Sequence, residues 1–207
     1  MLNIVYFGFL MTAVIVQSSP CTRIEEEEKC VIPVLDEIDW NRLPGTWYLT
    51  MNIKDPVEQT ASCFELRDIR DTDSGVYIEF RDIHVFPNKS KIHGTVPFHW
   101  IHMHDSIVKS DENYELLFIE EIKKYGGDQE AIADIKEVYK QPMSCMTDYK
   151  NQLICFECYE DGTRHVWVHT KSPRLNAEDV LNIRNELIEL GGGWSEVKLY
   201  LSGCSNL

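Results

Sequence analysis

The stretch GVYIEFRDIHVF, residues 75–86, decides the fold class because apolar and polar side chains alternate along it. This period of two is typical of a β-strand with one buried face. Seven further segments rich in aromatic and β-branched residues lie on either side of it: GTWYLTMNI (45–53), ASCFELRDI (61–69), KIHGTVPFHW (91–100), YELLFIEEI (114–122), QPMSCMTDY (141–149), QLICFEC (152–158) and RHVWVHT (164–170).

Turn-forming residues separate these segments, among them Asp-Pro at 55–56, Asp-Ser-Gly at 73–75 and Asp-Gly at 161–162. Such dipeptides favour tight turns. Eight short strands joined by short turns predict an all-β, antiparallel meander, either closed into a barrel or split into a sandwich.

One helix is predicted after the last of these strands. Asn176 and Asp179 have the spacing of an N-terminal cap, and the glycines at 191–193 end the helix. Val180, Ile183, Leu187 and Leu190 form an apolar stripe, so this helix packs against the rest of the molecule. A final strand is expected at 194–201, and the sequence DQEAIADIKEVYK (128–140) predicts a short inserted helix.

Composition restricts the function classes. The chain has 207 residues, of which 43% are hydrophobic, and a net charge of −14, so nucleic acid is not expected as a partner. The chain has seven cysteines, all of which follow residue 20. In an oxidising compartment most of them should be paired, and their odd number leaves at least one thiol free or bridging two chains.

The segment MLNIVYFGFLMTAVIV (1–16) has no charged residue and is too short to span a bilayer comfortably. Val16 and Ser18 fit the small-residue rule for cleavage, which predicts a secretory signal peptide at 1–18 and a secreted protein. The alternative is an uncleaved N-terminal anchor. Residues 19–44 follow as an acidic leader, and no other stretch approaches the length of a membrane span.

Three motifs stand out along the chain: Gly45-Thr46-Trp47 at the start of the first strand, Thr147-Asp148-Tyr149 at the turn between two late strands, and residues 166–173 at the end of the last strand, before the helix. In this order they resemble the three signatures of the lipocalin family, of which the first is G-x-W. The resemblance is to its apolipoprotein D, retinol-binding and bilin-binding group in particular. Lys171 stands where the family usually has an arginine stacked on the tryptophan of the first signature.

The resemblance implies an eight-stranded up-and-down β-barrel over residues 45–207, with the C-terminal helix packed outside and residues 19–44 closing one end. It also implies the disulfides Cys30–Cys158 and Cys63–Cys204. Cys145 and Cys155 are equidistant from the turn at Lys150 and could pair with each other, or one of them could pair with Cys21.

For function, the resemblance implies a secreted carrier, not an enzyme, that holds a retinoid, fatty acid, sterol or pigment without a cofactor. The alternatives are an amine- or haem-binding lipocalin, one that blocks a host protein, and an isomerase or de-epoxidase. The partners beyond the ligand are unknown. The inward phase of each strand predicts these lining residues: Met51, Phe64, Leu66, Ile78, Phe80, Phe98, Trp100, Leu117 and Trp167.

Other motifs carry weaker signals. His99, His102 and His104, with His165 and His169, could in principle form a cluster, but pairs of histidines two residues apart lack the specificity of a metal site, so no metal is expected. Cys155-Phe-Glu-Cys158 lies in a strand and not at a helix start, which disfavours redox chemistry. Asn88-Lys-Ser is an N-glycosylation sequon in an expected turn.

Overall fold

The computed structural model of the chain describes residues 29–53, 62–85, 91–124 and 140–206, together with residues 129, 132, 133 and 136. The predicted signal peptide, the first part of the acidic leader (19–28) with Cys21, and the sequon at Asn88 lie outside the described residues, as does most of the inserted helix. The few described residues of that insertion are helical. No helix in the described part is long and apolar enough to cross a membrane.

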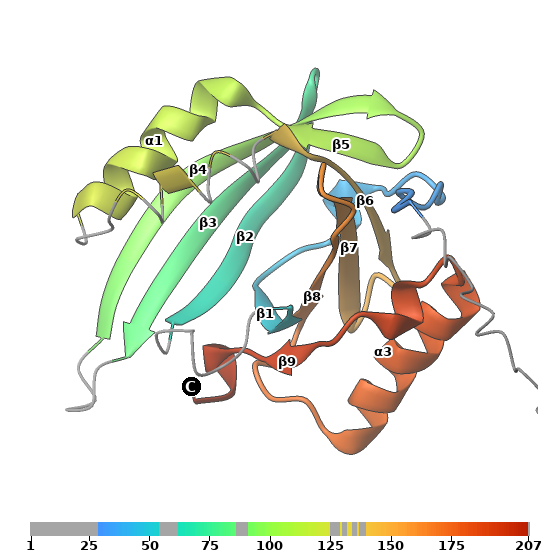
Figure 1. Cartoon of the computed structure of the whole chain (residues 1–207). Coiled ribbons are helices and arrows are strands. Elements are labelled where there is room, and N and C mark those ends of the chain that lie inside the picture. Colours follow the sequence, from blue (N-terminus) through green and yellow to red (C-terminus); the bar gives the residue numbers. More distant parts are fainter. Residues whose placement is uncertain are drawn as a thin grey trace, which may run out of the picture.

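The described strands form one curved antiparallel sheet (Figure 1). Consecutive strands pair from β2 to β8, β8 pairs with β1, and β1 pairs with β2, so the first eight strands close into a barrel. β9 lies outside it, against the end of β1. The strands are β1 (Trp47–Asn52), β2 (Ser62–Thr72), β3 (Gly75–Val85), β4 (Lys91–His104), β5 (Ile107–Ser110), β6 (Pro142–Thr147), β7 (Gln152–Cys158), β8 (Arg164–Thr170) and β9 (Tyr200–Leu201).

The fifth strand is not where the sequence predicts it. The segment at 114–122 is part of helix α1 (Glu112–Lys124), and the strand is the shorter β5 just before it. Acidic residues in the first turn and lysines in the last turn suit a helix, because they complement its dipole. Asp111 also accepts a hydrogen bond from the Asn113 N–H at 3.0 Å. The run of apolar residues at 116–119 does not distinguish a strand from a helix by periodicity.

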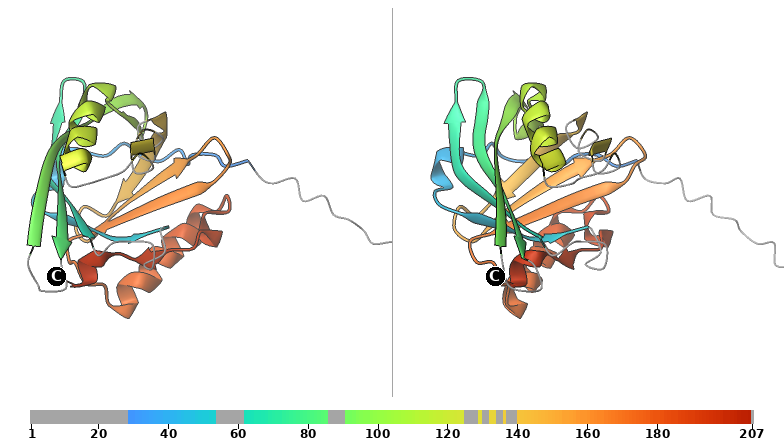
Figure 2. Two further views of the ribbon diagram at one scale, coloured as in Figure 1. Left: turned by 60° about the vertical axis from the view of Figure 1, so that its left-hand side comes forward. Right: turned by 90° about the vertical axis from the view of Figure 1, so that its left-hand side faces the viewer.

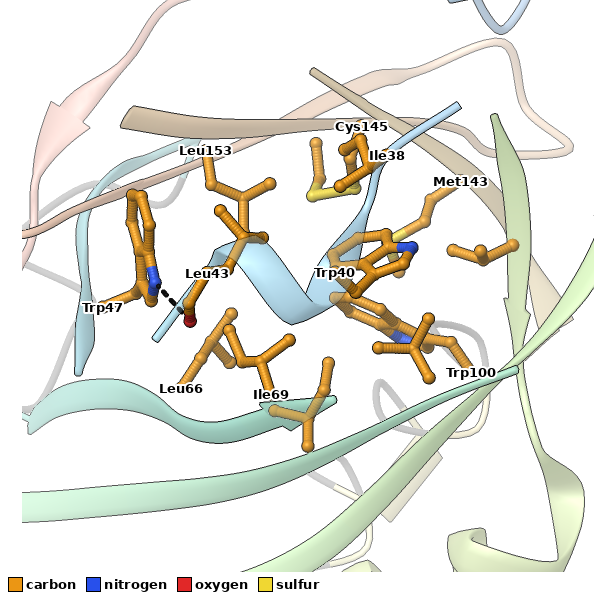
Figure 3. Packing of buried hydrophobic residues seen from close by; sticks show 14 of the residues in the cluster. Ile38, Trp40, Leu43, Trp47, Leu66, Ile69, Trp100, Met143, Cys145 and Leu153 are labelled. Carbon is orange, nitrogen blue, oxygen red and sulfur yellow. Dashed lines mark hydrogen bonds between the residues drawn. A yellow bond between two sulfur atoms is a disulfide. The ribbon is translucent and has the colours of Figure 1, made fainter. Parts of the chain in front are cut away.

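The barrel is filled at the end where β1 begins, which we call the Trp47 end. The Trp47 side chain is fully buried, and its Nε1 donates a hydrogen bond to the Leu43 carbonyl at 3.2 Å (Figure 3). Trp40, in the 3-10 helix Trp40–Arg42, lies against Trp100 of β4 with ring centroids 5.4 Å apart. The Lys171 ammonium lies 4.1 Å from the Trp47 ring and also hydrogen bonds to the Pro44 carbonyl.

The turn between β6 and β7 ties this end to the leader. Asp148 accepts hydrogen bonds from three consecutive backbone N–H groups, those of residues 150–152. Tyr149 adopts a positive φ of 61°, and its hydroxyl accepts a hydrogen bond from the Asp39 N–H at 3.1 Å. The Arg42 guanidinium lies over the same ring at 3.8 Å. The second signature therefore holds the 3-10 helix against the barrel.

Helix α3 (Ala177–Leu190) lies along the outside of the barrel, whereas α1 lies on the other side of the molecule (Figure 2). The predicted cap is present, because Asn176 and Asp179 form a reciprocal capping box. Ile183 and Leu187 are buried in an outer cluster with residues of β7 and β8. The predicted strand at 194–201 is reduced to Tyr200–Leu201, because Gly193 adopts a left-handed conformation and starts a 3-10 helix that turns Trp194 into this cluster.

Three disulfides cross-link the described residues. Cys30–Cys158 and Cys63–Cys204 join residues 128 and 141 positions apart, as the family resemblance implies. The alternative left open by the sequence is resolved, because Cys145 and Cys155 lie opposite each other on β6 and β7 and are bonded. The bridges Cys30–Cys158 and Cys63–Cys204 restrict the unfolded chain, and the chain-entropy model gives a stabilisation of about 5 kcal/mol for each of them.

We expect α3 to be held to the barrel by its buried stripe. Leu187→Ala should lower the free energy of unfolding by about 3 kcal/mol, because Leu187 has no exposed surface and its truncation leaves a cavity. Ile188, the next residue, is 56% exposed, so Ile188→Ala should change stability by less than about 0.5 kcal/mol. Urea denaturation followed by circular dichroism measures both, and equal losses in the two variants would contradict this packing.

Candidate functional site

The barrel interior gathers most of the lining residues that the sequence predicts. Leu66, Ile78, Phe98 and Trp100 belong to the interior cluster and are buried. Phe80 packs against this cluster and is only partly buried. Phe64 extends the aromatic surface on β2, with its ring centroid 5.2 Å from that of Phe80. Cross-strand pairs such as Ile78 with Phe98 place these side chains on one face of the sheet.

Two predicted lining residues lie elsewhere. Met51 belongs to the outer cluster beneath α3, because a bulge between Leu49 and Met51 in the pairing of β1 with β8 reverses the face of the residues that follow. Leu117 is on α1 and not on a strand, and 43% of its surface is exposed. The assignment of both residues to the barrel lining is therefore wrong.

Phe118 of α1 is a lining residue that the sequence analysis missed. Its ring centroid lies 5.3 Å from that of Phe80 and 6.0 Å from that of Phe98. The helix thus contributes an aromatic side chain to the interior, beside rings of β3 and β4. The available signal was the spacing of Tyr114 and Phe118, which places both on one face of a helix.

Glu157 is a second residue that was missed, and it faces the barrel interior. Glu157 has the same strand phase as Leu153 and Cys155, which lie in the interior cluster. Phe156, which precedes Glu157, points to the opposite face and belongs to the outer cluster. The Trp167 Nε1 donates a hydrogen bond to Glu157 Oε2 at 3.0 Å. Glu157 has no exposed surface, and its Oε1 has no hydrogen-bond partner among the residues that the structure describes. A carboxyl in such an apolar position is uncommon, because burying a polar atom without a partner costs free energy.

Burial perturbs two titratable groups of the interior face. Loss of hydration raises the pKa of Glu157 to about 7, and the hydrogen bond from Trp167 offsets only part of this. His169 is on β8, two residues from Trp167 and on the same face, and burial lowers its pKa to about 3. The imidazole of His169 is therefore neutral at physiological pH, whereas Glu157 exists there in both protonation states.

The histidines that raised the possibility of a metal site do not form one. No group of three or more potential metal ligands occurs among the described residues. His99 Nδ1 lies 3.1 Å from Asp111, and its Nε2 lies 3.1 Å from the Thr72 hydroxyl, so this ring links β4 to the start of α1. His165 stacks on Tyr159 with centroids 3.7 Å apart.

Two hollows occur on the outer surface. One, of about 380 Å³, lies at the Trp47 end beside Glu37, Asp39, Asp71 and His102. The other, of about 390 Å³, lies between the β7–β8 turn and residues 193–200. Neither is lined by the aromatic residues of the barrel interior. In that interior the side chains nearest the Trp47 end are fully buried, whereas Phe64, Phe80, Phe118 and Trp167 keep part of their surface exposed.

Comparison with known proteins identifies the fold. No family model and no curated protein matches the sequence. The structure is similar to insecticyanin from the tobacco hornworm Manduca sexta, with a TM-score of 0.51 and 12% identity over 84% of this chain and 85% of that one. Insecticyanin is a lipocalin. The chain has the lipocalin fold. Lobster apocrustacyanin A1 is also similar, with a TM-score of 0.48, 12% identity and coverage of 83% of this chain and 89% of that one.

The buried carboxyl of this barrel should make its stability depend on pH. The folded chain holds the Glu157 proton up to about pH 7, whereas the unfolded chain releases it near the ordinary value of 4.5. The stabilisation that accompanies the raised pKa is therefore complete below pH 4.5 and is lost as the pH rises through 7. The free energy of unfolding of Glu157→Gln, relative to that of the wild type, should therefore increase by about 3 kcal/mol as the pH rises from 4.5 to 8.

Urea denaturation at several pH values measures this difference. His169 is present in both proteins, so its own titration cancels. Glu160→Gln removes the same charge from an exposed position nearby and should show no such pH-dependent gain. A stability difference between Glu157→Gln and the wild type that stays constant across this range would contradict a buried, titrating carboxyl.

Proposed function

We propose that this lipocalin is a secreted binding or transport protein that holds a small hydrophobic ligand inside its barrel. The observation that carries the proposal is the aromatic surface formed by Phe64, Phe80, Phe98 and Phe118, whose rings adjoin one another at centroid distances of 5.2 to 6.3 Å. Three of these rings are only partly buried. Apolar surface inside a closed barrel gains about 25 cal/mol for each Å² that a ligand covers.

The two ends of the barrel support this reading. Trp40, Leu43 and Trp47 fill the Trp47 end and leave no exposed surface that a ligand could cover there. The partly buried rings lie further from that end, on β2, β3 and α1. A ligand of the proposed kind, such as a retinoid, fatty acid, sterol or pigment, would therefore bind toward the end where β7 finishes and α1 begins.

Secretion is part of the proposal. The three disulfides of the described residues suit an oxidising compartment, where a predicted signal peptide at 1–18 would direct the chain. Glycosylation at Asn88 would follow in that compartment and stays a prediction.

Catalysis is not proposed. Every described cysteine is in a disulfide, and the remaining one, Cys21, lies outside the described residues. An isomerase that depends on a thiol in the early strands of the barrel thus has no candidate there, because Cys63 of β2 is bonded to Cys204.

The proposal predicts that a neutral lipophile binds against Phe80. Diphenylhexatriene, which fluoresces in apolar surroundings, should bind saturably to the wild type, and Phe80→Gln should weaken this binding about tenfold, because an amide replaces part of the apolar surface. Tyr77 is on the opposite face of β3, beneath the Arg70 guanidinium, and Tyr77→Gln should leave the affinity unchanged. Fluorescence titration measures all three proteins.

Two results would contradict the proposal. One is the absence of saturable binding by the wild type, and the other is an equal loss of affinity in Phe80→Gln and Tyr77→Gln. Extraction of the native protein with organic solvent, followed by mass spectrometry, would then identify the ligand class independently of any probe.

A further inference from the structure

We infer that the ligand of this barrel is an amphiphilic amine, whose apolar body lies on the aromatic surface and whose ammonium group donates a hydrogen bond to Oε1 of Glu157. The inference rests on the proposed function, because it assigns the polar end of the same site. It makes Glu157 a specificity-determining residue, and it distinguishes among the ligands that the proposed function leaves open.

The first step is the position of the carboxyl. Glu157 lies on the inward face of β7, one residue before the end of the strand and away from the Trp47 end. Its Oε2 is occupied by the Trp167 N–H at 3.0 Å, which fixes the orientation of the group. Within the described part of the chain its Oε1 has no partner, although the side chain is completely buried. Because a carboxylate oxygen accepts hydrogen bonds, the complementary ligand group is a donor.

The second step is the charge around this oxygen. On the two strands that flank β7, the inward-facing side chains are Met143, Cys145 and Thr147 of β6 and His165, Trp167 and His169 of β8. None of them is a lysine or an arginine. A bound ammonium would therefore supply the positive charge that the ionised carboxylate lacks, and a charge-assisted hydrogen bond is stronger than a neutral one.

The third step excludes an anionic ligand end. A fatty acid would bring a second carboxylate next to Glu157, and two like charges in a buried site disfavour each other strongly. The chain as a whole has a net charge of −14, so its long-range field also attracts cations and repels anions. A neutral alcohol could donate a hydrogen bond to Oε1, but it would gain no ionic attraction.

The experiment compares three probes that share one alkyl chain and differ only in the polar end: decylamine, decan-1-ol and decanoate. Isothermal titration calorimetry at pH 8 should show that the wild type binds decylamine about tenfold more tightly than decan-1-ol, and decanoate more weakly than either. Glu157→Gln keeps the size of the side chain and an acceptor for Trp167, and it should remove the preference for the amine while binding decan-1-ol within about twofold of the wild type. Glu160→Gln, with the same loss of charge at an exposed site, should behave as the wild type.

The pH dependence of the decylamine affinity provides a second test, because a purely structural role of Glu157 would not make this affinity depend on pH. The affinity of the wild type for decylamine should fall about tenfold from pH 8 to pH 5.5, because the ammonium then competes with the proton on Glu157, whose pKa is about 7. His169 stays neutral over this range, since its pKa is about 3. In Glu157→Gln, which lacks this titrating carboxyl, the profile should be flat.

The possible results separate the inference from the proposed function. If decanoate binds the wild type as tightly as decylamine, or if Glu157→Gln weakens all three probes equally, the inference is wrong, and the barrel remains a site for lipophiles. If neither these probes nor diphenylhexatriene bind the wild type, the proposed function fails as well. A lost amine preference together with retained binding of decan-1-ol supports both.

Discussion

The barrel depends on how Trp47 closes one end of it. In the described residues, β1 and β2 are joined by only two residue pairs, Trp47 with Leu66 and Tyr48 with Glu65. The indole at this junction is held from three sides: by the Leu66 strand, by the Leu43 carbonyl and by the Lys171 ammonium on its face. Gly45 lies next to this ammonium with a φ of 81°, and any side chain there would meet both a strained backbone and the lysine. The Trp47 indole therefore packs at the junction where β1 and β2 close the sheet, and together with Trp40 and Leu43 it fills this end of the barrel.

Most of this architecture is present in the sequence as local patterns. The alternation along β3, the capping box at Asn176 and the turn at Asp148 each depend on residues a few positions apart, and each appears in the structure where the pattern predicts it. Long-range pairing is a different matter. The disulfides Cys30–Cys158 and Cys63–Cys204 follow only from the family resemblance, because spacing alone does not specify which cysteines approach one another.

The errors also have physical causes. Residues 114–122 contain a continuous apolar run, whose periodicity fits either a strand or a helix. The acidic residues at the start of α1 and the lysines at its end favour the helix. Met51 shows a second limit, because the bulge before it is set by the pairing of β1 with β8 and leaves no mark in the sequence of β1 itself. Glu157 was overlooked for the opposite reason. It has the phase of Leu153 and Cys155 along the strand, but a charged residue does not fit the pattern of a hydrophobic lining.

The packed core and the proposed binding surface thus occupy different parts of one interior. The Trp47 end uses buried aromatic rings, the hydrogen bond from Trp47 to the Leu43 carbonyl and a cation over an indole. Toward the other end the interior contains partly exposed rings and a carboxyl that is costly to ionise. Folding gains little from such a group above pH 7, since the apolar surroundings oppose its charge. The same surroundings strengthen its attraction for a cation, because a low dielectric weakens hydration and screening together. The buried carboxyl of Glu157 lowers the stability of the fold above pH 7, and for the same physical reason it is the group we propose to distinguish one ligand from another.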